Sequence, residues 1–128
     1  MRILLDTHIA LWAIGDDHRL PGKARNWIKD PANDIAVSAA SVWEISIKHS
    51  LSKTRMPVPG HQALVWFREA GYTLLSISAE HAVAVESLPN IHADPFDRIL
   101  VAQAQVEPMH LLTHDKTLSG YGERVWVV

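Results

Sequence analysis

Short apolar runs alternate along this chain with segments of helical periodicity, and this alternation constrains the fold more than any other feature. The runs are largely apolar along their whole length, as in strands buried on both faces, and we place them at 2–5, 34–38, 72–77, 111–113 and 124–127. The helical segments are expected at 7–14, 22–28, 41–51, 62–70, 79–88 and 95–106, with a helical turn at 116–118. This order predicts an α/β fold, a three-layer α/β/α sandwich around a short, mainly parallel sheet of about five strands.

The composition indicates one globular domain that spans residues 1–128. The 128 residues are 48% apolar and 20% charged, enough for a single core. The chain has no cysteine, which excludes disulfides and thiolate metal sites. The apolar run 9–14 is too short to cross a bilayer, and Asp6 interrupts any signal-peptide core. We therefore expect a soluble, cytoplasmic protein with no membrane association.

The net charge of −2 lacks the signature of a general nucleic-acid binder. One local exception is the segment 48–55, which has three formal positive charges and no acid. The favoured interpretation is a solvated helix end, where cations suit the helix dipole. The alternative is a patch that contacts phosphate groups.

Acidic residues stand where apolar runs end or helices begin: Asp6, Glu44, Asp94, Asp97 and Asp115. A carboxylate among Leu, Ile and Trp is costly to desolvate unless it is paired, hydrogen-bonded or bound to metal. In open α/β sheets the functional crevice lies beyond the carboxyl ends of the strands. Two of these acids follow strands directly, and two others are expected in the first turn of helices that can face the same edge. The pattern predicts a pocket for a hard divalent cation such as Mg²⁺ or Mn²⁺.

Each acid also has a structural alternative. Ser41 and Glu44 have the spacing of a capping box, and Asp94 precedes a proline as an N-cap residue does. Asp6 and Asp115 are also typical of turns that follow strands. Taken singly, these alternatives are at least as good as a site, but they do not explain why the acids gather at one edge.

The paired aspartates of the segment 94–97 can be separated on physical grounds. An N-cap aspartate uses its oxygens on the N–H groups of the next turn, so we assign Asp94 to capping and support, and Asp97 to metal binding. Thr7 and Thr113 could hydrogen-bond the carboxylates or a metal-bound water, or only cap turns. Arg98 is placed to contact a phosphate or to pair with Asp94.

The histidines and tryptophans receive structural interpretations. None of the eight histidines belongs to a His-Glu-x-x-His or metal-finger pattern, which argues against a zinc site. Trp27, Trp43 and Trp66 lie on helical apolar stripes, and we expect them in the core.

Four stretches of the sequence resemble the PIN domain and, more narrowly, the VapC-type toxins of type II toxin–antitoxin systems. They are Leu4-Leu5-Asp6-Thr7-His8, Ser41-Val42-Trp43-Glu44-Ile45, Asp94-Pro95-Phe96-Asp97-Arg98 and Leu112-Thr113-His114-Asp115. The resemblance covers the whole chain in the family's order, and the Asp-Pro-Phe-Asp-Arg stretch is its most specific part. It implies Mg²⁺- or Mn²⁺-dependent cleavage of RNA and a homodimer. By motif it assigns the acidic quartet to Asp6, Glu44, Asp97 and Asp115, and it gives no role to the histidines at 8 and 114.

The resemblance further implies a small cognate antitoxin, VapB-like, that covers the acidic edge. Two alternatives remain: a housekeeping PIN-domain nuclease outside a toxin–antitoxin pair, and a non-catalytic module whose acids hold a structural cation. A nucleotide-binding module is disfavoured because the chain has neither Gly-x-Gly-x-x-Gly nor Gly-x-x-x-x-Gly-Lys. A dehalogenase-like phosphatase is disfavoured because no second acid stands two positions after Asp6.

Overall fold

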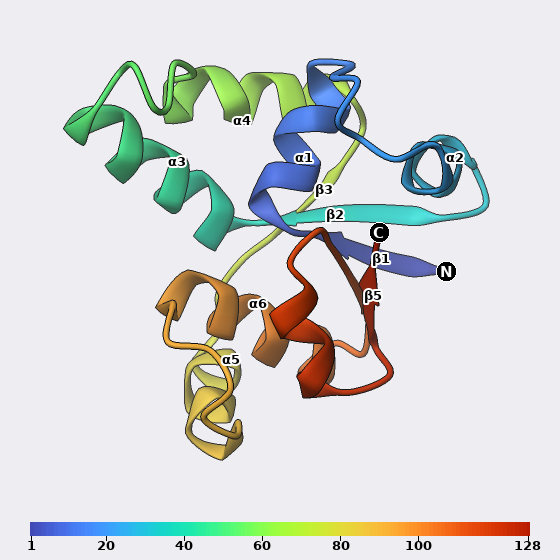
Figure 1. The fold of residues 1–128 in the computed structure, drawn as a ribbon, viewed down its shortest axis with the longest axis vertical. Coiled ribbons are helices and arrows are strands. Elements are labelled where there is room, and N and C mark those ends of the chain that lie inside the picture. Colours follow the sequence, from blue (N-terminus) through green and yellow to red (C-terminus); the bar gives the residue numbers. More distant parts are fainter.

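The computed structural model describes residues 1–128 and contains one sheet of five parallel strands in the order β3-β2-β1-β4-β5 (Figure 1). The strands are β1 (Arg2–Leu5), β2 (Asp34–Ser38), β3 (Thr73–Leu75), β4 (His110–Thr113) and β5 (Val125–Val127). The central strand β1 pairs with β2 and β4, so that Leu5 lies beside Val37 on one side and Leu112 on the other. The prediction of a short parallel sheet is confirmed. Only the strand expected at 72–77 is clearly shorter than predicted.

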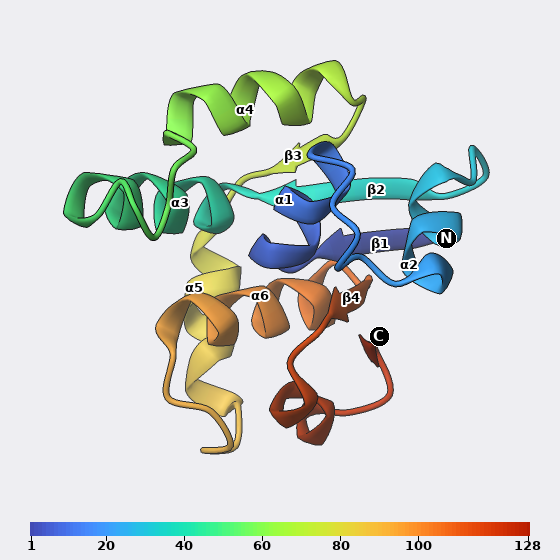
Figure 2. The same ribbon diagram turned by 45° about the horizontal axis from the view of Figure 1, so that its top comes forward.

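Helices cover both faces of the sheet, as the continuous apolar strands predict. They are α1 (Thr7–Ile14), α2 (Gly22–Lys29), α3 (Ala39–Leu51), α4 (Gly60–Glu69), α5 (Ala79–Ala84) and α6 (Pro95–Val106), with 3-10 helices η1 (Val85–Ser87) and η2 (Lys116–Tyr121). Helices α1, α2 and α4 lie on one side of the sheet, and α5 and α6 lie on the other (Figures 1 and 2). The molecule is therefore the three-layer sandwich that the sequence predicts.

The two faces of β1 belong to two separate cores. Ile3 and Leu5 are fully buried against one set of helices, together with Phe67 of α4. Leu4 points to the opposite face, where it joins Leu100 of α6 in the second core. A strand buried on both faces cannot move relative to its neighbours without opening a core, and this rigidity fixes the residues that follow it.

Helix α3 begins directly at the end of β2, earlier than predicted. Ser38 is its N-cap residue, and its side-chain oxygen accepts the N–H of Ala40 at 3.0 Å. The capping-box interpretation of Ser41 and Glu44 is therefore wrong, because Ser41 is already inside the helix. Glu44 lies in the second turn instead of the first, with its carboxylate free of any capping role.

Helix α6 begins as predicted. The Asp94 carboxylate accepts the N–H of Phe96 at 2.8 Å, and Pro95 occupies the first helical position, where a missing N–H costs nothing. The helix expected at 79–88 is shorter: it ends at Ala84 and continues as η1. None of the helices has the length and apolar character that crossing a membrane requires.

Two of the tryptophans expected in the core lie at the surface. Trp43 is 58% exposed and Trp66 is 39% exposed, whereas Trp27 is partly buried and packs against Trp126. The prediction for Trp43 is wrong because successive helical residues differ in direction by about 100°. Ile45 occupies the buried face of α3, and Trp43 projects from another face, where its ring meets Phe96 edge-on at 5.1 Å.

Candidate functional site

The carboxyl ends of the central strands lie beside the first turns of α1, α6 and η2, and the predicted acids gather there. The N–H of Asp6 donates to the carbonyl of Leu112 at 2.9 Å, which holds the ends of β1 and β4 side by side. A cavity of 340 Å³ opens at this edge, and it is lined by Asp6, His8, Trp12, Glu44, Lys48, Asp94, Asp97, His114 and Asp115. Parallel strand order and strand register thus bring together residues that are up to 109 positions apart in the sequence.

Asp6 is the most rigidly held of the acids. It is 7% exposed, and one of its oxygens accepts the N–H of Thr7 at 2.7 Å as the N-cap of α1. The other oxygen accepts the hydroxyl of Thr113 at 2.7 Å. Burial raises the pKa of Asp6 above its ordinary value, and the two hydrogen bonds oppose this rise. The two hydrogen bonds fix the direction of this carboxylate, which lines the cavity.

Glu44 is buried in the second turn of α3 and has a donor on each oxygen. The hydroxyl of Thr7 donates to Oε1 at 2.8 Å, and the ammonium group of Lys48 lies 2.5 Å from Oε2. The pKa of Lys48 is raised: partial burial of its ammonium lowers it, but the hydrogen bond and charge of Glu44 outweigh that effect. Lys48 therefore belongs to the cavity, and the interpretation of the segment 48–55 as a wholly solvated helix end is wrong at this residue.

Asp97 projects into the cavity from the first turn of α6 and is the least compensated acid. Its pKa is raised from 3.8 to about 7, first by burial and then by the negative charges of Asp6 and Asp94. Asp94 also lines the cavity, but one of its oxygens is used to cap the helix. Asp94 therefore caps the helix as predicted, whereas the metal-binding role of Asp97 stays a prediction.

Asp115 follows β4 and begins η2. Its Oδ1 accepts both the N–H of Thr117, at 3.0 Å, and the hydroxyl of that residue, at 2.7 Å. The Thr117 hydroxyl is the main cause of a lowered pKa for Asp115. The hydroxyl of Thr113 accepts the N–H of Asp115 at 3.0 Å while it donates to Asp6. The prediction that Thr7 and Thr113 can hydrogen-bond the carboxylates is confirmed.

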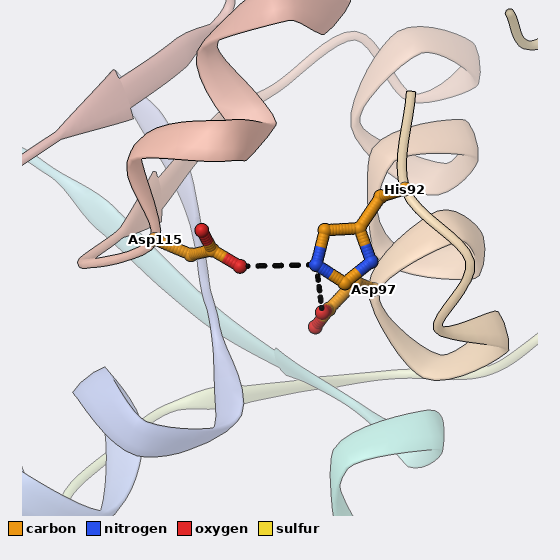
Figure 3. A group of neighbouring side chains, drawn as sticks. All are labelled: His92, Asp97 and Asp115. Carbon is orange, nitrogen blue, oxygen red and sulfur yellow. Dashed lines mark hydrogen bonds and ion pairs between the residues drawn. The ribbon is translucent and has the colours of Figure 1, made fainter. Parts of the chain in front are cut away.

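His92 is a residue that the sequence interpretation missed. Its Nε2 atom lies 3.1 Å from Oδ2 of Asp115 and 3.5 Å from Oδ2 of Asp97 (Figure 3). One atom from each of these three side chains falls within 4.8 Å of the other two, close enough to share an ion. The sequence signal was available but weak, because His92 stands two positions before the N-cap of α6 in a segment without helical or strand periodicity.

The guanidinium of Arg98 neither lines the cavity nor pairs with the Asp94 carboxylate, so the predicted ion pair is wrong. Its guanidinium donates to the carbonyls of Pro89, at 3.0 Å, and Val85, at 3.3 Å, and to the hydroxyl of Tyr121 at 3.1 Å. One position along a helix turns a side chain by about 100°, which directs Arg98 away from the cavity that Asp97 faces. It braces the segment that leads into α6.

The donor set suits a hard divalent cation. The cavity offers carboxylate oxygens from four elements, no thiolate and no pair of histidines at zinc spacing. Apart from the histidines, Lys48 is the only lining residue that carries a positive charge. The cavity therefore has an excess of negative charge, which a cation would neutralise. The prediction of an acidic pocket whose side chains could hold a metal ion is confirmed, at this coarser level.

This fold and this acidic edge define a PIN domain, and the chain belongs to that family: the PIN domain model matches residues 3–123. A curated relative is Ribonuclease VapC22 of Mycobacterium tuberculosis, which is 27% identical over 122 residues and covers 93% of this chain and 91% of its own. The fold is shared with VapBC2 from Rickettsia felis bound to a DNA fragment from its promoter, at a TM-score of 0.70, 20% identity and coverage of 100% and 98%. It is also shared with a toxin–antitoxin complex from Klebsiella pneumoniae, at a TM-score of 0.68, 19% identity and coverage of 98% and 99%.

Proposed function

We propose that this chain is an endoribonuclease that depends on Mg²⁺ or Mn²⁺, and that it is the toxin of a type II toxin–antitoxin pair. The single observation that carries the proposal is the convergence of five carboxylates, four of which form the proposed quartet, on one cavity at the carboxyl edge of the sheet. The curated relative is named a ribonuclease, which supports RNA as the substrate. The whole chain, residues 1–128, acts as one PIN domain, and we place it in the cytoplasm.

The metal ligands in this proposal are Asp6, Asp97 and Asp115, with Glu44 completing the set. These residues would hold a divalent ion, which would supply an activated water and neutralise charge on the scissile phosphate. Asp97 is suited to the role because its charge has no strong partner in the metal-free protein, as its pKa of about 7 indicates. Thr113 holds Asp6 and Thr7 holds Glu44, so these ligands need little reorganisation when an ion binds.

The basic residues beside the cavity suit an RNA backbone. A second cavity of 350 Å³ adjoins the first, since both are lined by His8 and Lys48, and Arg55 lies farther along it. A phosphodiester chain that enters the acidic cavity would pass these side chains, which offset the repulsion between carboxylates and phosphates. We therefore assign the segment 48–55 to phosphate contact, the alternative that the sequence alone disfavours.

The partner in this proposal is a small, VapB-like antitoxin. A groove of 350 Å³ with a half-apolar lining shares His8 and Trp12 with the acidic cavity and continues along Leu11, Val58 and Trp66. An amphipathic antitoxin segment in this groove would place a lysine or arginine among the carboxylates, where charge-assisted hydrogen bonds are strong. The structural relatives include toxin–antitoxin complexes, which supports such a partner. We also propose that the protein is a homodimer.

The test is cleavage of labelled total RNA by purified protein with Mg²⁺, with Mn²⁺ and with chelator. We expect cleavage only with metal, and loss of at least two orders of magnitude in Asp97→Asn. Glu123→Gln, an exposed acid that does not line the cavity, is the matched control. Cleavage that is undiminished in chelator would overturn the metal site. Metal binding without any RNA cleavage would favour the non-catalytic cation-binding module.

A further inference from the structure

The loop before α6 holds His92 by its main chain as well as by its ring. Its N–H donates to the hydroxyl of buried Tyr121 at 3.0 Å, and its carbonyl accepts from Arg98 at 3.4 Å. Its Nδ1 atom accepts the backbone N–H of Asp94 at 3.1 Å. All of its hydrogen-bonding atoms except Nε2 are thus engaged within the loop and its supports.

The contact with Asp94 determines where the hydrogen of the neutral ring resides. A backbone N–H can only donate, so Nδ1 of His92 must present its lone pair, and the ring hydrogen is on Nε2. That N–H faces two carboxylate oxygens, Oδ2 of Asp115 at 3.1 Å and Oδ2 of Asp97 at 3.5 Å (Figure 3). An Nε2 that carries hydrogen has no lone pair for a metal. The short distances among these three side chains therefore do not make His92 a ligand.

We infer that His92 is a positioning residue, locked as the Nε2–H tautomer, that orients Asp115 and Asp97 for the metal. This inference rests on the metal site of the proposed function. The other two acids of the quartet already have such donors, Thr113 for Asp6 and Thr7 for Glu44. His92 completes the set, because no other side chain donates to Oδ2 of Asp115.

The tautomer can be observed without metal and without activity. Two-bond ¹H–¹⁵N NMR of the chelated protein distinguishes a protonated ring nitrogen from an unprotonated one. We expect the His92 ring to show hydrogen on Nε2 and none on Nδ1, and Asp94→Ala, which retains the backbone N–H, to leave this pattern unchanged. An Nδ1–H tautomer in the chelated protein would overturn the inference.

The positioning role is tested by the affinity for Mn²⁺, measured from the EPR signal of the free ion. Donors of this kind contribute about 10- to 100-fold in metal affinity, so His92→Ala should bind Mn²⁺ at least about 10-fold more weakly. His92→Gln places an amide N–H near the position of Nε2 and should restore most of the affinity. The amide of His92→Asn reaches only the position of Nδ1, so this variant should not restore the affinity. The main-chain contacts to Tyr121 and Arg98 persist in all three variants, which favours correct folding.

The control is His114→Ala, since His114 lines the same cavity while its ring contacts the main-chain oxygen of Val128 and no aspartate or glutamate side chain. Its Mn²⁺ affinity should stay within about threefold of the unmodified protein. If the unmodified protein binds Mn²⁺ and His92→Ala binds it equally well or more tightly, the inference on His92 is wrong and the metal site stands. If the unmodified protein binds no Mn²⁺, the proposed function itself fails, and the inference fails with it.

Discussion

At the residue scale, the electrostatic cost of gathering the acids in one cavity falls mainly on the carboxyl group of Asp97. Its pKa is about 7 in the folded protein and 3.8 is its ordinary value. Between these values the folded metal-free protein binds a proton that the unfolded chain releases. Stability attributable to this group is therefore fully present below about pH 4 and is lost as pH rises to about 7. A bound cation would reverse this cost, because it favours the charged form.

Replacement by an uncharged residue should remove that pH dependence. We expect Asp97→Asn, in chelator at pH 7.5, to melt about 5 °C or more above the unmodified protein, and to differ little from it at pH 4. Thermal unfolding followed by circular dichroism at both pH values measures this. Glu123→Gln, an exposed acid, should shift neither curve. An equal effect of Asp97→Asn at both pH values would show that its charge does not strain the folded state.

Thr113 links two of the acids through a single hydroxyl. It donates to Asp6 and accepts the N–H of Asp115, so Thr113→Val should weaken Mn²⁺ binding by about 10- to 100-fold. The near-isosteric change also leaves a buried oxygen of Asp6 without its donor, at a cost of about 1–3 kcal/mol in unfolding free energy. Thr113→Ser keeps the hydroxyl and should retain most of the Mn²⁺ affinity and most of the unfolding free energy. EPR titration and chemical denaturation measure the two effects, and full Mn²⁺ affinity in Thr113→Val would contradict the supporting role.

At the element scale, the ends of helices were predicted correctly where a single residue type determines the backbone conformation. The Asp-Pro start of α6 and the glycine that ends α4, Gly71 with φ of 84°, lie as predicted. The start of α3 was misplaced because Ser38 and Ser41 are both good cap residues, and the choice depends on where β2 ends. The exposed position of Trp43 was not predicted, because a shift of one residue along a helix can turn a side chain from the core to the surface.

Asp94 stabilises α6 as its N-cap residue, and this role can be separated from its negative charge. Asp94→Ala removes the cap of α6 and should lower the unfolding free energy by about 1 kcal/mol, with a smaller effect on cleavage than any change at Asp97. Asp94→Asn keeps a side-chain oxygen for the N–H of Phe96 and should be nearly as stable as the unmodified protein. Chemical denaturation and RNA cleavage are measured on both variants. If Asp94→Ala is as stable as Asp94→Asn but inactive, the roles of Asp94 and Asp97 have been assigned in the wrong order.

At the scale of the whole molecule, parallel topology explains both the success and the limit of prediction from sequence. Asp6 and Asp115 could be placed at one edge because both directly follow strands of the same sheet. His92 could not, since its approach to Asp115 depends on the path of a loop that Arg98 and Tyr121 hold. Arg98 was misassigned for the same reason: its acceptors are carbonyls of that loop, whose position no local pattern encodes.

The same arrangement predicts that metal binding is linked to global stability. Mg²⁺ or Mn²⁺ at a hundredfold excess over its dissociation constant should stabilise the fold by about 2.7 kcal/mol, since the unfolded chain does not assemble the four acids. We expect the melting temperature to rise by several degrees with either ion, and the rise to disappear in EDTA. Asp97→Asn should show a much smaller shift. No shift in the unmodified protein at millimolar Mn²⁺ would count against the site.

We expect the acidic cavity and the adjoining groove to form one surface that binds an antitoxin. Because the two share Trp12, a partner helix in the groove could deliver a cationic side chain to the carboxylates of the proposed metal site. Expression of the chain alone should therefore inhibit growth, and co-expression of the small protein encoded beside it should relieve the inhibition. Asp97→Asn should be harmless while still binding the partner, because the groove and the remaining acids persist. Replacing the partner's inserted lysine or arginine with alanine should weaken the complex, measured by calorimetry. Harmless expression of the unmodified chain, with no binding to the neighbouring gene product, would favour a housekeeping PIN-domain nuclease.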